Sequence, residues 1–310
     1  MTHMKHRAPK ETKEHTTVLL DETVSGLQLA KGDTAIDATV GSGGHAQELA
    51  RAVGKKGTLV VLDVDQHALD ETRKKLTDMS GTIIYVHGNF RNLRAHARES
   101  GIEEADGIVF DLGWRSEQLA SGRGLSFNAD EPLDMSLGDG NSKFTAKDII
   151  ADWDEVEIAA MIRRYGEERF SGRIARAIVE ARRRTPLETS RALAQVIQSA
   201  VPSFYRHGRI HPATRTFQAL RIAVNDELEA LTAGLTDALE LLGEGGRVAV
   251  ISFHSLEDRI VKHMFRQAES DGKGRRITKK PIQPAREERT SNPRSRSAKL
   301  RIFEKHHDAN

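Results

Sequence analysis

The sequence contains no cysteine. Disulfide bonds, thiolate catalysis and cysteine-ligated zinc or iron–sulfur sites are therefore excluded. No apolar run approaches the ~18 residues that are needed to span a bilayer, so no membrane partner is expected. Residues 1–14 lack the apolar segment of a signal peptide, and we predict a disordered leader there and a cytoplasmic location.

The distribution of charge is uneven along the chain. The net charge is only +2, yet residues 271–305 hold twelve Lys or Arg against four Asp or Glu, a local charge of +8. A basic segment attached to an acidic body favours an anionic partner, and nucleic acid is the commonest one. A solvated disordered tail would account for the same charge, so both interpretations stay open.

The first 113 residues alternate short apolar runs with amphipathic segments. Strands are predicted at residues 34–37, 58–62, 82–86 and 107–110, with helices between them at about 45–53, 66–78 and 93–100. This alternation is typical of βαβ units that build a parallel sheet.

The pattern changes after residue 113. Residues 114–145 are rich in Gly, Ser, Asp and Pro, which predicts a long functional loop. Residues 147–201 contain helical patterns with arginine-rich polar faces and no strands. The α/β pattern then resumes with one long helix at about 216–242 and strands at 247–253 and 299–303. We therefore predict a Rossmann-like domain formed by residues 15–125 and 212–305, a loop plus helical insertion at 126–211, and a tail at 306–310.

A glycine-rich loop follows the first predicted strand, in the sequence Asp37-Ala-Thr-Val-Gly41-Ser-Gly43-Gly44-His45. Glycines at a strand-to-helix turn let the backbone approach a ligand closely, although the pattern alone also fits a simple tight turn. Asp37 can bind the ammonium of a methionine moiety and would repel a pyrophosphate. The loop therefore favours S-adenosyl-L-methionine over a nicotinamide cofactor, with Asp37, Gly41, Gly43, Gly44 and His45 in the site.

Suitable side chains also follow the next three predicted strands. Asp63 can accept hydrogen bonds from ribose hydroxyls, Phe90 can stack on adenine, and Asp111 follows the fourth strand. Open α/β sheets bind ligands at the carboxyl ends of their strands, so these groups are expected to share one pocket. The plainer alternatives are that Asp63 caps a helix and that Phe90 belongs to the core.

The chain resembles the bacterial ribosomal RNA small-subunit methyltransferase H family, also called MraW, from residue 15 to about 305. The resemblance is carried by the glycine loop and by several longer motifs: His15-Thr-Thr-Val-Leu-Leu-Asp-Glu22, Gly88-Asn-Phe90, Asp111-Leu-Gly113, Pro132-Leu-Asp-Met135, Tyr165-Gly-Glu-Glu-Arg-Phe170, His211-Pro-Ala-Thr-Arg-Thr-Phe-Gln218, Ile251-Ser-Phe-His-Ser-Leu-Glu-Asp-Arg259 and Asn292-Pro-Arg-Ser-Arg296.

The resemblance implies a class I S-adenosylmethionine methyltransferase that methylates N4 of a cytosine in the decoding centre of 16S rRNA, with the small ribosomal subunit as partner. Its implied cofactor contacts are Gly43, Gly44, His45, Asp63, Phe90, Asp111 and Gln118. One departure bears on the target base: the family's usual Gly-Val-Ser-Ser-Pro is replaced by Gly113-Trp-Arg-Ser-Glu117.

Catalysis is assigned to Asp111. An acceptor that hydrogen-bonds the cytosine amine and later takes its proton is expected at the fourth strand end. DNA amino-methyltransferases place an Asn/Asp-Pro-Pro-aromatic motif there, which this sequence lacks. His254 and Asp258 could face the same cleft, or Ser255 to Asp258 could be a helix capping box. No third ligand accompanies His254 and Glu257, so no metal site is predicted.

Basic side chains are expected to position the RNA through phosphate contacts. The predicted substrate-binding residues are Arg206, Arg209, Arg215, His254, Arg294 and Arg296. Arg215 and Arg221 could instead pair with carboxylates such as Glu227. To reach its amine, the cytosine must be unpaired or flipped, at a cost of a few kcal/mol.

Several functions and assemblies stay open on the sequence alone. The alternatives are a non-catalytic RNA-binding or ribosome-assembly factor, an NAD(P)-dependent oxidoreductase, and a methyltransferase with a lipid, small-molecule or DNA acceptor. A homodimer is also compatible with the sequence.

Overall fold

The computed structural model describes residues 16–113, 118, 121–137 and 143–306. The predictions for the leader, for Trp114-Arg115 and for residues 307–310 of the tail lie outside these ranges. Within the described part of the chain, no helix is both long and apolar enough to cross a membrane.

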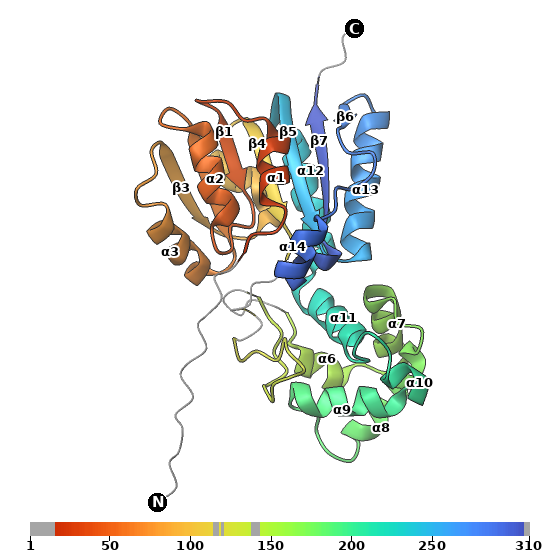
Figure 1. Cartoon of the computed structure of the whole chain (residues 1–310). Helices are drawn as coiled ribbons and strands as arrows, with labels where there is room; N and C mark the ends of the chain where they lie inside the picture. The colour runs from red at the N-terminus through yellow and green to blue at the C-terminus, as the bar shows by residue number, and fades with distance from the viewer. Residues whose placement is uncertain (1–15, 114–117, 119–120, 138–142, 307–310) are drawn as a thin grey trace, which may run out of the picture.

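A seven-stranded sheet forms the centre of the larger, α/β part of the molecule (Figure 1). Its strands are β1 (Thr34–Asp37), β2 (Thr58–Asp63), β3 (Thr82–His87), β4 (Ala105–Asp111), β5 (Leu242–Ser252), β6 (Gly274–Arg276) and β7 (Lys299–Lys305). They are ordered β3-β2-β1-β4-β5-β7-β6, and β7 runs antiparallel to both of its neighbours. The parallel run from β3 to β5, with connections that reverse direction between β1 and β4, confirms the Rossmann-like α/β prediction.

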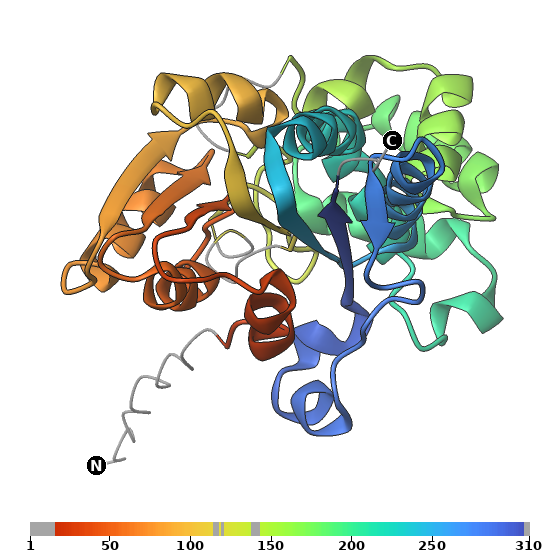
Figure 2. The same cartoon turned by 90° about the horizontal axis from the view of Figure 1, so that it is seen from above.

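Helices cover both faces of this sheet (Figure 2). One face carries α1 (Leu20–Leu27), α2 (Gly44–Val53) and α3 (Gln66–Lys75); the other carries α4 (Leu93–Glu99), α12 (Glu227–Leu241) and α13 (Ser255–Ser270). Side chains alternate between the faces along each strand, as in β4, where Val109 packs on the first face and Phe110 on the second. Burial on both faces explains why the strands are nearly continuous apolar runs.

The helical insertion packs around a separate core below the sheet (Figure 1). It contains α6 (Ala146–Asp152), α7 (Glu155–Gly166), α8 (Ser171–Arg182), α9 (Ser190–Ala200), α10 (Ser203–Arg206) and α11 (Thr214–Asn225). Buried residues of α11, including Phe217 and Leu220, belong to this core. The predicted domain boundaries stay predictions, but this packing argues that the insertion reaches the end of α11.

The single long helix predicted at 216–242 is wrong. The chain forms two helices, α11 and α12, and breaks at Asp226, whose φ of 51° lies in the left-handed region. Aspartate tolerates this conformation better than most residues, so the break needs no glycine. It turns the chain from the insertion back to the sheet.

The C-terminal part adds two short elements before β7. These are α14 (Arg286–Ser291) and the 3-10 turn η2 (Pro293–Ser297). They lie beside the end of the sheet that faces the insertion (Figure 1). A second 3-10 turn, η1 (Phe90–Asn92), connects β3 to α4.

Candidate active site

A cavity of about 830 Å³ lies where β1 to β4 end, between the sheet and the insertion. Its first wall, the strand-end wall, includes Asp63, Phe90, Asp111 and Gln118. Its second wall, the junction wall, consists of residues 223–227, where α11 meets α12, together with Glu257 of α13. Four of the predicted cofactor residues therefore share one cavity at the switch point of the sheet.

The glycine loop lies behind this cavity, and its backbone favours glycine. Gly41 and Gly43 have positive φ values of 53° and 79°. A Cβ added to Gly44 would lie 1.8 Å from Thr17 Oγ1, so the beginning of the chain packs directly on the loop. Larger residues at these positions would displace the loop.

The segment that covers the glycine loop is held by the other end of the chain. The Leu19 N–H donates to Glu288 Oε1 over 3.0 Å, and Asn292 Nδ2 donates to the Thr16 carbonyl over 3.0 Å. We call these two contacts the terminal clasp. The clasp fixes the position of the segment that rests on Gly44.

Asp63 is oriented by the backbone on either side of it. The Gly41 N–H donates to Oδ2 and the Asp65 N–H donates to Oδ1, both over 2.9 Å. The alternative that Asp63 caps the following helix is wrong, because Asp65 is the N-cap of α3 and accepts from the His67 N–H. The ribose role of Asp63 stays a prediction that its place on the strand-end wall suits.

Asp37 is a buried carboxyl with an unmet hydrogen-bonding need. Its side chain accepts from the Thr39 N–H at Oδ1, while Oδ2 has no hydrogen-bond partner among the described residues. Burial raises the pKa of Asp37 to about 8, and the neighbouring carboxyls of Asp111 and Asp63 add to the rise. A ligand ammonium would supply the missing partner, so Asp37 fits the methionine end of the predicted cofactor.

Asp111 borders the cavity and exposes 20% of its side chain. Its Oδ2 lies 3.7 Å from Nδ1 of the buried His45, and its Oδ1 has no hydrogen-bond partner within the described ranges. Burial raises the pKa of Asp111 to about 7; the charge of Arg294 opposes this rise, and that of Glu257 adds to it. A carboxyl that titrates near neutral pH is suited to accept a proton.

Phe90 packs in the core and also borders the cavity, so its position is compatible with both predictions, a core residue and a ring that stacks on adenine. Its ring meets Phe110 edge to face, with 5.6 Å between centroids, and its backbone and ring pack closely on Gly234 of α12. The same residue lines the cavity, as Gln118 does. Phe90 is therefore anchored in the core while it remains available for stacking.

Two ion pairs organise the junction wall. Arg221 of α11 binds Glu227 of α12 through Nε and one terminal nitrogen, over 2.9 and 3.0 Å, which confirms this predicted alternative. At the cavity rim, Arg91 donates to Asp226 Oδ2 over 2.8 Å. These pairs connect the insertion to α12 and to the turn after β3.

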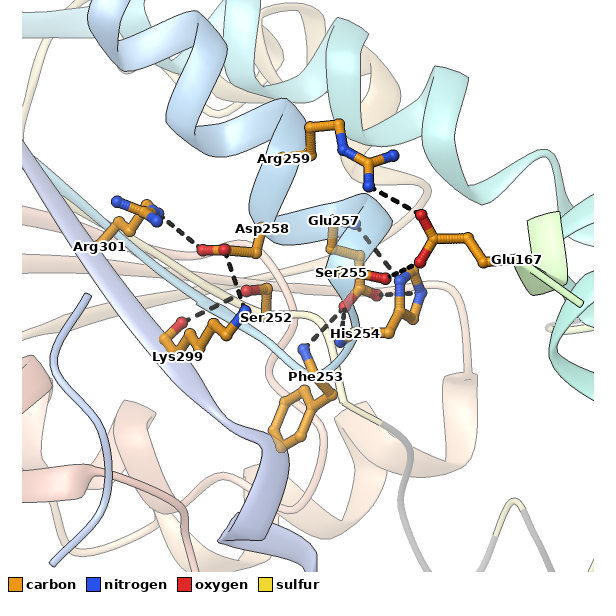
Figure 3. Close-up of polar contacts among 10 residues, drawn as sticks. All are labelled: Glu167, Ser252, Phe253, His254, Ser255, Glu257, Asp258, Arg259, Lys299 and Arg301. Carbon is orange, nitrogen blue, oxygen red and sulfur yellow. Dashed lines mark hydrogen bonds and ion pairs between the residues drawn. The ribbon is translucent and has the colours of Figure 1, made fainter. Parts of the chain in front are cut away.

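Glu257 is the most strongly fixed carboxylate of the junction wall (Figure 3). The N–H groups of Phe253 and His254 donate to its Oε2 over 2.8 and 3.2 Å, and His254 Nε2 lies 3.2 Å from Oε1. Burial favours a raised pKa for Glu257, but His254, Arg221 and the Phe253 N–H outweigh it and hold the pKa below its usual value. Glu257 is thus a buried permanent anion beside Asp111.

The capping box at the start of α13 uses a different pair from the one predicted. His254 is the N-cap and Glu257 is the N3 residue, in place of Ser255 and Asp258. Asp258 turns away from the cavity and binds Lys299 and Arg301 of β7, over 3.1 and 2.7 Å (Figure 3). His254 is occupied by this box, and its predicted contact with substrate stays a prediction.

Three possible metal ligands come together that the sequence did not reveal as a group. Single ligand atoms of Glu227, His254 and Glu257 lie within 4.8 Å of one another. However, His254 Nδ1 accepts the Glu257 N–H, which leaves the ring proton of a neutral imidazole on Nε2. Glu227 is already paired with Arg221 through both oxygens. The group is better explained as an ion-pair network than as a metal site.

The insertion also contacts the start of α13 (Figure 3). Glu167, which follows α7, accepts hydrogen bonds from Ser255 Oγ and from Arg259, the latter over 2.7 Å. The Glu167 carbonyl accepts from Arg215 over 3.0 Å. Arg215 therefore supports the contact between the insertion and α13. It does so through a backbone carbonyl, in place of the predicted pairing with a carboxylate.

The predicted substrate arginines fall into two groups. Arg206 donates to the carbonyls of Val201 and Ser199 at the end of α9, and Arg296 donates to the Arg289 carbonyl. Arg209 is exposed, with no hydrogen bond or ion pair to any described residue. Arg294 is half-buried, close enough to Asp111 to lower its pKa. The structure thus brings only Arg294 to the cavity carboxyls.

Comparisons with known proteins agree with this geometry. The model of the MraW methylase family matches residues 12–306. A ribosomal RNA small subunit methyltransferase H from Brevibacillus brevis is 44% identical, covering 94% of this chain and 98% of the relative. A protein of the same name from Persephonella marina is also 44% identical, covering 93% and 98%.

Solved structures match the chain at low sequence identity. An rRNA methylase from Streptococcus thermophilus is 12% identical, with a TM-score of 0.45, covering 92% of this chain and 95% of the other.

Proposed function

Because the chain belongs to the MraW methylase family, we propose that it methylates N4 of a cytosine in the decoding centre of 16S rRNA, within the small ribosomal subunit in the cytoplasm. Family membership confirms the methyltransferase class and S-adenosyl-L-methionine as the cofactor predicted from the sequence. The observation that supports the specific reaction is a single cavity with four of the predicted cofactor residues on one wall and the fixed carboxylate of Glu257 on the other.

The strand-end wall is assigned to the cofactor. Asp63 is placed to accept from ribose hydroxyls, Phe90 to stack on adenine, and Asp37 to bind the ammonium group behind the glycine loop. When bound, S-adenosylmethionine supplies a methyl group that the cytosine amine takes by displacement at the sulfonium. Because such a displacement is in line, the main contribution of the protein is to hold both partners in position.

Asp111 is assigned as the proton acceptor. Its side chain lines the cavity and is 20% exposed, so a carboxyl oxygen can accept from the N4 amine and then take the proton that N4 loses on methylation. Its pKa of about 7 places this exchange near neutral pH. Glu257 stays ionised and stabilises the positive charge that develops on N4.

The decisive experiment is transfer of labelled methyl to small ribosomal subunits from cells that lack the enzyme. Mass spectrometry should locate the label on N4 of one decoding-centre cytosine. Label on another base or on a ring carbon would overturn the assignment of N4. Binding of the cofactor without any transfer would favour the non-catalytic assembly factor.

Ligand binding also tests the cofactor class directly, against the nicotinamide cofactor that the glycine pattern alone left open. S-adenosylhomocysteine should raise the melting temperature, whereas NADH should leave it unchanged. A shift with NADH alone would contradict the assignment of the glycine loop.

A further inference from the structure

The loop that leads from α9 to α11 differs in composition from the rest of the insertion. Residues 203–215 contain three arginines and two histidines, with no aspartate or glutamate. They also present two apolar side chains to solvent: Phe204, which is 68% exposed, and Ile210, which is 54% exposed. An aromatic ring on a surface of one sign of charge is typical of a nucleic-acid contact.

The ring of Phe204 lies against the guanidinium of an exposed arginine, Arg169. The guanidinium of Arg169 lies 5.4 Å from the centroid of the Phe204 ring, and also 4.7 Å from Phe170 and 5.1 Å from Tyr205. Tyr205 is held in turn by a hydrogen bond from its hydroxyl to Glu168. The ring of Phe204 is therefore oriented, although most of its surface is open.

The backbone of this loop is also anchored at both ends. Arg206 binds the carbonyls at the end of α9, and the His211 ring stacks on Phe127 with 4.4 Å between centroids. Between these anchors, His207 and Arg209 are exposed and make no hydrogen bond or ion pair to the part of the chain that the structure describes. The loop thus offers an oriented ring and free positive charge on a fixed backbone.

We propose that Phe204, backed by Arg169, is a stacking site for an unpaired nucleobase of the RNA substrate, with Arg209 contacting the adjoining phosphate. The inference rests on the proposed function in one respect, that the substrate is RNA. An unpaired nucleotide fits because its base offers a flat face to the ring and its phosphate offers a negative charge to the arginines. A neutral apolar partner would leave Arg209 without a counter-charge.

This site is distinct from the cavity. Helix α10, which carries Phe204, lies on the insertion, away from the strand ends that bear Asp63 and Asp111 (Figure 1). A base bound there would fix the RNA relative to the insertion while another base enters the cavity. Loss of the site should therefore weaken RNA binding and leave the chemistry of the bound complex intact.

The test compares Phe204→Ala and Phe204→Trp with Val156→Ala, a control that removes an equally exposed apolar side chain from α7 of the same insertion. Stacking of one base contributes about 5- to 150-fold in affinity, so Phe204→Ala should raise KM and Kd for unmethylated small subunits by such a factor. Its kcat and its affinity for S-adenosylhomocysteine should not change. Phe204→Trp should restore binding, and Val156→Ala should behave as the parent protein does.

A second measurement makes the stacking itself visible. Single-stranded RNA containing 2-aminopurine should lose fluorescence on binding the parent protein, and the quenching should disappear in Phe204→Ala but persist in Val156→Ala. Unchanged binding and quenching in Phe204→Ala would overturn the proposal. So would weaker binding to whole subunits without weaker binding to protein-free rRNA, because the partner of Phe204 would then be a ribosomal protein.

The two proposals fail separately. If the parent protein binds RNA and quenches 2-aminopurine but transfers no methyl group, the stacking site stands and the proposed reaction does not. If methyl transfer occurs with full efficiency in Phe204→Ala, the proposed reaction stands and the stacking site does not.

Discussion

Asp111 on the strand-end wall is half-buried and Glu257 on the junction wall is buried; both border one cavity, yet their surroundings differ. Asp111 keeps one oxygen without a hydrogen-bond partner in the described structure, and its pKa rises to about 7. Glu257 receives two backbone N–H groups and the His254 ring, and its pKa falls below the usual value. Two carboxyls whose pKa values are shifted in opposite directions suit two roles, one that exchanges a proton and one that stays charged.

The difference between these two carboxyls indicates where a ligand is expected. A buried polar atom without a partner destabilises the free protein, and a substrate or cofactor that supplies the partner removes this cost. Asp37 and Asp111 satisfy this description, whereas Glu227 and Glu257 do not. Substitution of Asp37, Asp111 or Glu257 alters one of these carboxyls at a time.

The largest effect is expected from Asp111→Asn. The amide cannot take a proton, so kcat for methyl transfer should fall by about 10²–10⁴-fold while small-subunit binding persists. Single-turnover transfer of labelled methyl measures this change. Asp152→Asn, an exposed aspartate at the end of α6, is the matched control and should retain full activity. Near-normal kcat in Asp111→Asn would assign the proton to another group.

Asp37→Asn should change binding and stability in opposite directions. Loss of the charge that faces the ammonium should weaken S-adenosylhomocysteine binding by about tenfold or more, since a charge-assisted hydrogen bond is lost. Without ligand, the variant should be more stable by about 1–3 kcal/mol at pH 7, because it removes a buried group that resists ionisation. Calorimetric titration and urea denaturation measure the two effects.

The pH dependence of this second effect has a definite sign. The folded-state pKa of Asp37 is about 8, well above its unfolded value. The contribution of Asp37 to stability therefore falls as pH rises from about 4 to 8, because Asp37 ionises in the unfolded chain and stays protonated in the folded one. The advantage of Asp37→Asn should vanish near pH 3 and reach its full size above pH 8. A difference that does not vary with pH would contradict this account.

Glu257→Gln should lower kcat by about tenfold, the order expected when one electrostatic contact to the developing charge is removed. The negative charge of Glu257 raises the pKa of Asp111, so its loss should lower that pKa. Activity requires ionised Asp111 and falls as pH drops through about 7; in the variant this fall should occur at lower pH. A pH profile of kcat tests the shift, with Glu269→Gln on the same helix as control. An unshifted profile would separate Glu257 from Asp111.

The smallest effect is expected from Arg91→Gln at the cavity rim. The Arg91–Asp226 pair crosses between the walls, but the side chains are 36% and 54% exposed. Exposed pairs contribute at most about 1 kcal/mol, so stability and kcat should change little. Arg94→Gln, which breaks the similarly exposed pair with Glu240, is the control for urea denaturation. A much larger loss in Arg91→Gln alone would show that the rim contact holds the walls together.

Much of the sheet layer could be predicted because burial on both faces leaves a simple pattern. The strand at 34–37 was predicted with its observed bounds, and the next three within one or two residues. The break at Asp226 was missed because good helix formers stand on both sides and nothing local requires the left-handed turn. The short elements α1, β6 and α14 were not predicted, since their positions depend on tertiary contacts.

The site follows the same division. Asp63, Phe90 and Asp111 were predicted to share a pocket because strand ends of a parallel sheet meet at one edge, and Gln118 was implied by the family resemblance. All four line one cavity. Glu227 was expected only as a partner for arginine, and Glu257 was considered only within a helix cap and as an incomplete metal site. The role of Glu257 depends on α13 packing opposite β4, which no sequence spacing specifies. The His254-Ser-Leu-Glu257 capping pattern was the one local signal of its position.

The terminal clasp has a consequence for how the chain folds during its synthesis. Residues near the start of the chain rest on the glycine loop, and they are held by Glu288 and Asn292, which are synthesised almost 250 residues after that loop. A nascent chain can form most of the sheet before these residues exist, but it cannot form the terminal clasp. The segment that rests on Gly44 can therefore be held in place only after residue 292 has been synthesised and has left the ribosome.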